Sequence, residues 1–196
     1  MKTFSQLKTL LITLVAVCAA SSALAADSYK IDTKGAHAFI QFKIKHLGYS
    51  WLYGRFDRFN GSLKLDEKHP ENSSIEVTVD VTSVNSNHAE RDKHLRGSDF
   101  LDVKQFPTAR FVSTSVEATD KNTAVVTGNM TLHGVTKAIR IPVTRIGAGS
   151  DPWGGYRQGF SGSVTLKLKD YGIDYNLGPA STEVELTLDI EAIKQQ

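Results

Sequence analysis

The chain has 196 residues, with 23 Lys and Arg against 21 Asp and Glu, 40% hydrophobic residues and 9% aromatic residues. This length fits one large or two small domains, and the ordinary apolar content excludes wholesale disorder. The formal net charge of +2 is too small to give the basic footprint of a nucleic-acid-binding protein.

The first 25 residues have the layout of a secretory signal peptide. Lys2 and Lys8 form a positive segment, residues 9–20 are apolar, and Ala23-Leu24-Ala25 offers a small-residue cleavage site. The apolar run is too short to cross a ~30 Å hydrocarbon core as a permanent helix. We therefore predict a cleaved signal peptide over residues 1–25, a mature chain over residues 26–196, and a periplasmic location.

Cleavage would change the composition of the working protein. It removes Lys2, Lys8 and the only cysteine, Cys18, which leaves 21 basic against 21 acidic residues. The mature chain then has no thiol nucleophile, disulfide or cysteine metal ligand. No second hydrophobic segment of membrane-spanning length follows residue 26, so we expect a protein that does not span the membrane and does not bind nucleic acid.

The dominant pattern after residue 26 is an alternation of apolar and polar residues with a period of two. Such alternation predicts half-buried strands. It occurs in residues 38–46, 61–66, 74–84, 109–117, 124–132, 138–146, 164–169 and 183–190. Turn-forming stretches separate these segments, which predicts an antiparallel sandwich or closed barrel in a single domain. Asn60-Gly61 is compatible with either a hairpin turn or a bulge.

Residues 87–106 break the alternation and are rich in helix formers. Asn87 is suited to cap a helix because Glu90 follows three residues later, and Gly97 and Pro107 interrupt and end the stretch. We predict a helix at about residues 88–95 and a helical turn near residues 98–103. This short helical segment, near residues 88–103, would cover one end of a barrel.

Catalytic and metal-binding patterns are weak. The candidate metal ligands are His46, His88, His94 and His133. His88 and His94 are six residues apart, a spacing that does not place both on one helix face. Nucleophile-elbow and phosphate-loop motifs are absent from the sequence. We therefore predict no catalytic residue, no metal ligand and no cofactor. An enzyme would require His46, His94 and His133 to converge with a carboxylate such as Asp99.

Aromatic residues crowd the first third of the mature chain. In a closed eight-stranded barrel, inward side chains either fill the interior or leave space for one apolar ligand. The residues alone leave both alternatives open.

Several specific strings occur in a fixed order. They are HLG at residues 46–48, NHAERD-x-HLR at 87–96, DFLDV at 99–103, GNMTLHGVTK at 128–137 and LGPAS-x-EV at 177–184. Together they resemble the YceI-like family of periplasmic, lipocalin-like proteins, and the resemblance covers essentially the whole mature chain. Tyr171 stands where many relatives carry Phe.

The resemblance implies an all-β fold, an eight-stranded antiparallel lipocalin-like barrel with helical turns near its opening. It also implies an apolar tunnel that binds a polyisoprenoid chain, an isoprenoid quinone or a similar long-chain amphiphile, and a homodimer in many members. We therefore expect a periplasmic carrier of such a lipid. The alternatives are an enzyme acting on a lipid or small substrate, and a stress-related interaction protein with a filled barrel.

A tunnel for a hydrocarbon chain needs apolar walls, and polar groups only at its mouth. We predict the tunnel lining to be Ile40, Phe42, Ile44, Trp51, Phe56, Phe59, Val77, Val79, Phe100, Leu101, Phe111 and Leu132. The candidates for contacts with a head group are His46, His94 and Arg96.

Overall fold

The computed structural model describes residues 26–196, and these residues form mainly β-strands. The strands are β1 (Asp27–Ile31), β2 (Phe39–His46), β3 (Ser50–Phe56), β4 (Phe59–Leu65), β5 (Ser74–Asp80), β6 (Val84–Asn85), β7 (Thr108–Asp120), β8 (Thr123–Leu132), β9 (Val135–Ser150), β10 (Tyr156–Lys167) and β11 (Glu183–Lys194). The helix α1 spans Ala89–Leu95, and short 3-10 helices span Pro70–Asn72, Val81–Ser83, Leu168–Tyr171 and Pro179–Ser181. Within residues 26–196, no helix has the length and apolarity that crossing a bilayer requires.

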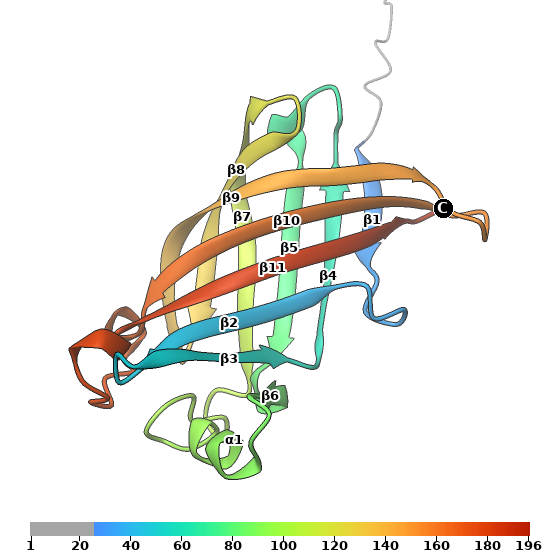
Figure 1. Ribbon diagram of the computed structural model, residues 1–196. Helices are drawn as coiled ribbons and strands as arrows, with labels where there is room; N and C mark the ends of the chain where they lie inside the picture. Colours follow the sequence, from blue (N-terminus) through green and yellow to red (C-terminus); the bar gives the residue numbers. More distant parts are fainter. Residues whose placement is uncertain (1–25) are drawn as a thin grey trace, which may run out of the picture.

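Eight of the strands close into an antiparallel barrel (Figure 1). Their order around the ring is β1-β4-β5-β7-β8-β9-β10-β11, and β11 pairs back to β1. The short strand β1 makes this closure, because Tyr29 lies opposite Leu63 of β4 on one side and opposite Lys194 of β11 on the other. The predicted barrel is therefore confirmed, and the sandwich is not the fold.

The three remaining strands extend the wall beside one end of β11. The first part of β11 pairs with β2, with Val184 opposite Ile44, whereas its last residues pair with β1. Strand β2 pairs with β3, and β3 pairs with β6 only at Arg55 and Phe56. Strands β2, β3 and β6 therefore form a side layer that continues the barrel sheet toward α1 (Figure 1).

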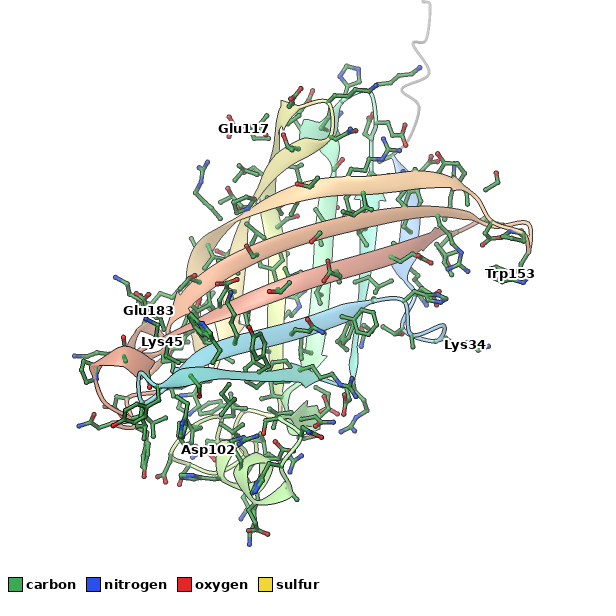
Figure 2. The ribbon with its side chains drawn as sticks, viewed as in Figure 1. Lys34, Lys45, Asp102, Glu117, Trp153 and Glu183 are labelled. Atoms are coloured by element: carbon green, nitrogen blue, oxygen red, sulfur yellow. The ribbon has the colours of Figure 1, made fainter. Side chains whose placement is uncertain are left out.

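The two ends of the barrel differ. The β7–β8 turn and the β4–β5 connection lie at one end, and α1 with the segment that follows it lies at the other (Figure 1). Glu117, on β7, and Asp102, after α1, mark these two ends in Figure 2. The sequence prediction that a helical segment covers one end of the barrel agrees with this arrangement.

The predicted helix begins one residue later than expected and has a different cap. Asn87 has a left-handed φ of 63°, so it lies outside the extended conformation that an N-cap residue adopts. His88 is extended, and its Nδ1 accepts the Arg91 backbone N–H at 3.2 Å. Residues 98–103 form hydrogen-bonded turns instead of a second helical turn, with the Phe100 N–H donating to the Gly97 carbonyl.

Every segment with predicted alternation overlaps a strand, whereas β1 and β3 were not predicted. Asn60 and Gly61 lie inside β4 in unbroken register with β5, so both the hairpin turn and the bulge are wrong. A Cβ on Gly61 would lie 2.6 Å from the Glu76 carbonyl oxygen. Glycine at this position therefore reflects close strand approach, which sequence alone does not distinguish from a turn.

Candidate functional site

The barrel encloses a cavity of about 460 Å³, within the range of ligand pockets in proteins. Its lining includes residues from all eight strands of the ring and Ile40 of β2. The cavity runs from the β7–β8 turn to Val79 and Ala109, which pair with each other near the opposite end. The interior of the barrel is therefore hollow, which contradicts the alternative of a filled barrel.

The wall of the cavity is apolar because alternate residues of each strand point inward. Its apolar side chains are Ile31, Ile40, Leu63, Leu65, Pro70, Ile75, Val77, Val79, Ala109, Phe111, Val116, Ala118, Ala124, Val126, Met130, Ile139, Ile141, Val143, Phe160, Val164, Leu186, Leu188 and Ile190. Such a wall offers a ligand no hydrogen bonds. Affinity must come from apolar area removed from water, at about 25 cal/mol per Å².

Polar lining residues gather at the end of the β7–β8 turn and the β4–β5 connection, here called the mouth. They are Asp66, Glu67, Ser73, Asp120, Lys121, Asn122, Thr123, Arg145 and Gln158, whereas the polar lining residues Arg110 and Ser161 lie further along the wall. Lys121 and Asn122 are exposed, so the cavity reaches the surface at this end. Glu117 is labelled close to this end in Figure 2.

Three of the mouth residues are joined by direct contacts. Arg145 Nη2 donates to Glu67 Oε1 at 3.0 Å, and Gln158 Nε2 donates to the same oxygen at 2.9 Å. The side chain of Gln158 is buried and also donates to Tyr29 Oη at 2.9 Å. Burial raises the pKa of the Tyr29 phenol. Its hydroxyl therefore stays protonated at neutral pH.

The opposite end is closed by side chains from the α1 region. Phe100 is buried, and Leu95, Leu101 and Val103 pack against the same core cluster. Tyr171 also belongs to this cluster, with 2% of its surface exposed. Its hydroxyl has no hydrogen-bond partner among residues 26–196, and burial raises its pKa. The helical turns therefore cover the closed end, instead of lying near the opening as the family resemblance implied.

The predicted lining residues fall into three groups. Those on the cavity wall are Ile40, Val77, Val79 and Phe111. Those buried or partly buried elsewhere in the interior are Phe42, Ile44, Phe56, Phe59, Phe100, Leu101 and Leu132. Trp51 belongs to neither group, since it is 51% exposed.

The side layer explains why the aromatic residues of β2 and β3 do not line the cavity. Trp51 lies opposite Lys45 on the outer face, with Lys43 Nζ 5.2 Å from its ring centre. On the inner face, the Phe42 ring packs over Gly54 and lies 5.8 Å from the Phe56 ring. Apolar character alone did not reveal which face of β3 points inward.

The predicted head-group residues lie away from the mouth. His46 is exposed at the last position of β2, and His94 Nε2 lies 3.0 Å from the Asp99 carboxylate. Arg96 donates to the backbone carbonyls of Thr82 and Val84 and lines a separate polar pocket of about 340 Å³ beside α1. The structure therefore does not bring these three side chains to the cavity, because α1 lies at its closed end.

Sequence reasoning missed Glu67, Arg145 and Gln158. Gln158 shares the period-two phase of Phe160 and Val164, so a polar residue in an inward phase was a usable signal. Glu67 and Arg145 had no such signal. Their meeting depends on how the ring closes.

A second group of titratable side chains joins β1, β10 and β11. Asp32, His37 and Glu191 lie close enough together to hold a cation. However, Arg157 Nη1 already donates to both carboxylates, at 2.7 Å to Asp32 Oδ2, and His37 Nδ1 lies 3.0 Å from the same oxygen. The guanidinium supplies the positive charge that a metal would bring, so we interpret this group as a structural ion-pair cluster.

A YceI-like domain model matches residues 29–192. The chain is 60% identical over 180 residues to a UPF0312 protein of Pseudomonas aeruginosa, covering 92% of this chain and 93% of that protein. A UPF0312 protein of Pectobacterium carotovorum is 52% identical over 193 residues, covering 97% and 100% of the two chains. The chain belongs to the YceI-like family.

Solved structures share the fold. BcnA of Burkholderia cenocepacia matches with a TM-score of 0.73 at 23% identity, covering 82% of this chain and 98% of that chain. The Campylobacter jejuni YceI protein matches with a TM-score of 0.71 at 28% identity, covering 79% and 91%. A polyisoprenoid-binding domain from Saccharophagus degradans matches with a TM-score of 0.64 at 17% identity, covering 85% and 98%.

Proposed function

We propose that this chain is a periplasmic binding or carrier protein for a long-chain isoprenoid lipid, an isoprenoid quinone or a similar amphiphile. The observation that carries the proposal is the cavity of about 460 Å³, which has apolar walls and polar groups at one end. That division matches an amphiphile, whose chain avoids water and whose head group does not. The proposed signal peptide, residues 1–25, lies outside the described residues.

The similar fold of a polyisoprenoid-binding domain supports an isoprenoid ligand over other hydrocarbons. Isoprenoid quinones fit the same requirements, because their chain is also free of hydrogen-bonding groups. The homodimer implied by the family resemblance stays a prediction, and light scattering of the exported protein would test it.

Binding without catalysis fits the positions of the titratable residues better than an enzyme does. An enzyme acting in the cavity would need His46, His94, His133 and Asp99 to converge there. In the described residues, none of these four lines the cavity. His133 Nδ1 lies 3.0 Å from the Tyr171 carbonyl oxygen, and its ring packs against Phe106. These contacts give His133 a structural role at the β8–β9 turn.

Organic extraction of natively purified protein, followed by mass spectrometry, tests the proposal directly. The expected result is one long-chain isoprenoid or quinone per protein molecule. Protein that is repeatedly empty and also fails to bind added farnesol would overturn the proposal.

A pair of neighbouring substitutions on β8 tests where the chain binds. Val126 lines the cavity, whereas Val125 does not, so Val126→Phe should obstruct the interior and Val125→Phe should not. We expect Val126→Phe to weaken farnesol binding by about tenfold or more, since overpacking a filled space is costly. Calorimetric titration measures both variants. Equal losses would place the ligand elsewhere.

A further inference from the structure

An ion pair crosses the mouth of the cavity. Glu67 follows β4 by two residues, and Arg145 lies on β9. In the eight-stranded ring, β4 and β9 are four positions apart in either direction. The contact of 3.0 Å between Glu67 Oε1 and Arg145 Nη2 therefore joins opposite walls. The head group of a ligand whose chain fills the cavity must lie beside this pair.

The charges that line the mouth have an acidic balance. Asp66, Glu67 and Asp120 contribute three carboxylates, against the two cations of Lys121 and Arg145. Arg145 and Glu67 neutralise each other, which leaves the carboxylates of Asp66 and Asp120 against the single cation of Lys121. The backbone N–H groups of His69 and Lys68 help to lower the pKa of Asp66, so this carboxyl is ionised at neutral pH. A phosphate or diphosphate placed here would meet like charge in a partly enclosed site.

The same region offers uncharged hydrogen-bonding groups. The Asn122 amide lines the exposed rim, and no hydrogen bond joins its side chain to another residue in the range 26–196. Gln158 presents a buried amide that is held in place by Glu67 and Tyr29. Both N–H groups of Gln158 are used in these two contacts, so this amide can offer a ligand only its accepting oxygen, which suits a hydroxyl. The Asn122 amide can both donate and accept, so it suits a hydroxyl or a carbonyl.

We propose that the mouth is a head-group subsite that accepts an uncharged, hydrogen-bonding head group, such as an alcohol or a quinone, and disfavours a phosphate or diphosphate. This inference rests on the proposed function, because it concerns the head group of the same amphiphile. The proposed function requires only that the ligand has an apolar chain, and this inference adds that its head group is uncharged.

Farnesol and farnesyl diphosphate test the inference, since they share one chain and differ only in the head group. Calorimetric titration of the exported protein at low ionic strength should show farnesol binding about tenfold more tightly. Added salt should reduce this difference, because screening weakens the repulsion of the diphosphate. A head group that simply remained in water would give similar affinities for both ligands.

A pair of carboxylate variants tests whether the preference for farnesol over farnesyl diphosphate comes from the mouth. Glu67→Gln removes one negative charge there and should strengthen diphosphate binding severalfold, with little change for farnesol. Glu183→Gln is the control, since Glu183 is exposed at the start of β11, does not line the cavity and lies away from the Glu117 end in Figure 2. It removes the same charge and should leave both affinities unchanged. Thermal unfolding of each variant establishes that it is folded.

Three results would contradict the proposed head-group subsite, and they differ in whether they also contradict the proposed function. Diphosphate binding as tight as farnesol binding would overturn the subsite and leave the apolar cavity as the ligand site. Equal effects of Glu67→Gln and Glu183→Gln would overturn it too, because the discrimination would then come from overall charge. If neither ligand binds, the proposed function and the subsite both fail.

Discussion

Gly128 of β8 shows how one missing side chain shapes the cavity. A Cβ at this position would lie 2.5 Å from Cζ of Phe111, which lines the cavity, and 2.5 Å from the Val112 carbonyl oxygen. The backbone oxygen cannot move away without disturbing the β7–β8 pairing. We expect Gly128→Ala to lower the free energy of unfolding by about 2 kcal/mol, measured by urea denaturation.

Gly147 of β9 provides the matched control, because no heavy atom lies within 4 Å of a Cβ built there. Gly147→Ala should leave the free energy of unfolding within about 0.5 kcal/mol of the parent value. If both variants lost a similar free energy of unfolding, the effect of Gly128→Ala would not come from the packing of Phe111.

Single residues were predictable where their environment follows from strand phase. Ile40, Val77, Val79 and Phe111 line the cavity because alternate positions of a strand share one face. The position of Arg96 was not predictable, because a guanidinium suits an anionic head group and backbone carbonyls equally well. Here it donates to the carbonyls of Thr82 and Val84. Composition does not separate these two uses.

At the scale of elements, the segment after α1 closes one end of the barrel. Phe100 is buried there, with its ring centre 4.9 Å from His94 and 5.0 Å from Tyr175. Phe100→Ala should lower the free energy of unfolding by about 3 kcal/mol, since it leaves a cavity in a packed cluster. Denaturant titration checks this value.

Phe39, at the start of β2, is the control for loss of an aromatic side chain, because it is 41% exposed. Phe39→Ala should cost less than about 1 kcal/mol. If Phe100→Ala costs no more than this, the segment after α1 does not close the barrel as a packed element.

The elements that sequence analysis missed have identifiable physical features. Strand β1 is only five residues long and directly follows the predicted cleavage site. Strand β3 places large aromatic residues on its outer face and Gly54 on its inner face, which reverses the usual alternation. Periodicity finds long strands with one buried face, and these two strands do not fit that description.

At the scale of the whole molecule, the open end of the cavity depends on contacts between distant parts of the chain. The ring closes where β1 meets β4 and β11, and the mouth forms where Glu67 reaches Arg145. The sequence supports a barrel, but these pairings span much of the chain and leave no local pattern. For this reason the sequence did not indicate the mouth, and the candidates His46, His94 and Arg96 lie away from it.

The ion-pair cluster that joins β1, β10 and β11 makes the stability of the barrel sensitive to acid. Burial alone would raise the pKa of Asp32, but hydrogen bonds from Arg157, the Gly35 backbone N–H and His37 outweigh it. Together they lower the pKa from 3.8 to about 2. Arg157 also donates to Asp151 and lowers the pKa of that carboxyl. In the folded protein both groups bind a proton less readily than in the unfolded chain.

The contribution of these carboxylates is therefore fully present above about pH 4 and is lost as the pH falls toward about 2. We expect the urea midpoint to fall steeply over that interval. Asp32→Asn should be less stable than the parent at pH 7 and should lose less stability on acidification, because it lacks the titrating group. Glu117→Gln, at the far tip of β7 (Figure 2), is the control and should keep the parental slope. If the urea midpoint of Asp32→Asn fell in parallel with that of the parent below about pH 4, the acid sensitivity would not come from Asp32. The contacts that close the barrel would then be insensitive to the charge of Asp32.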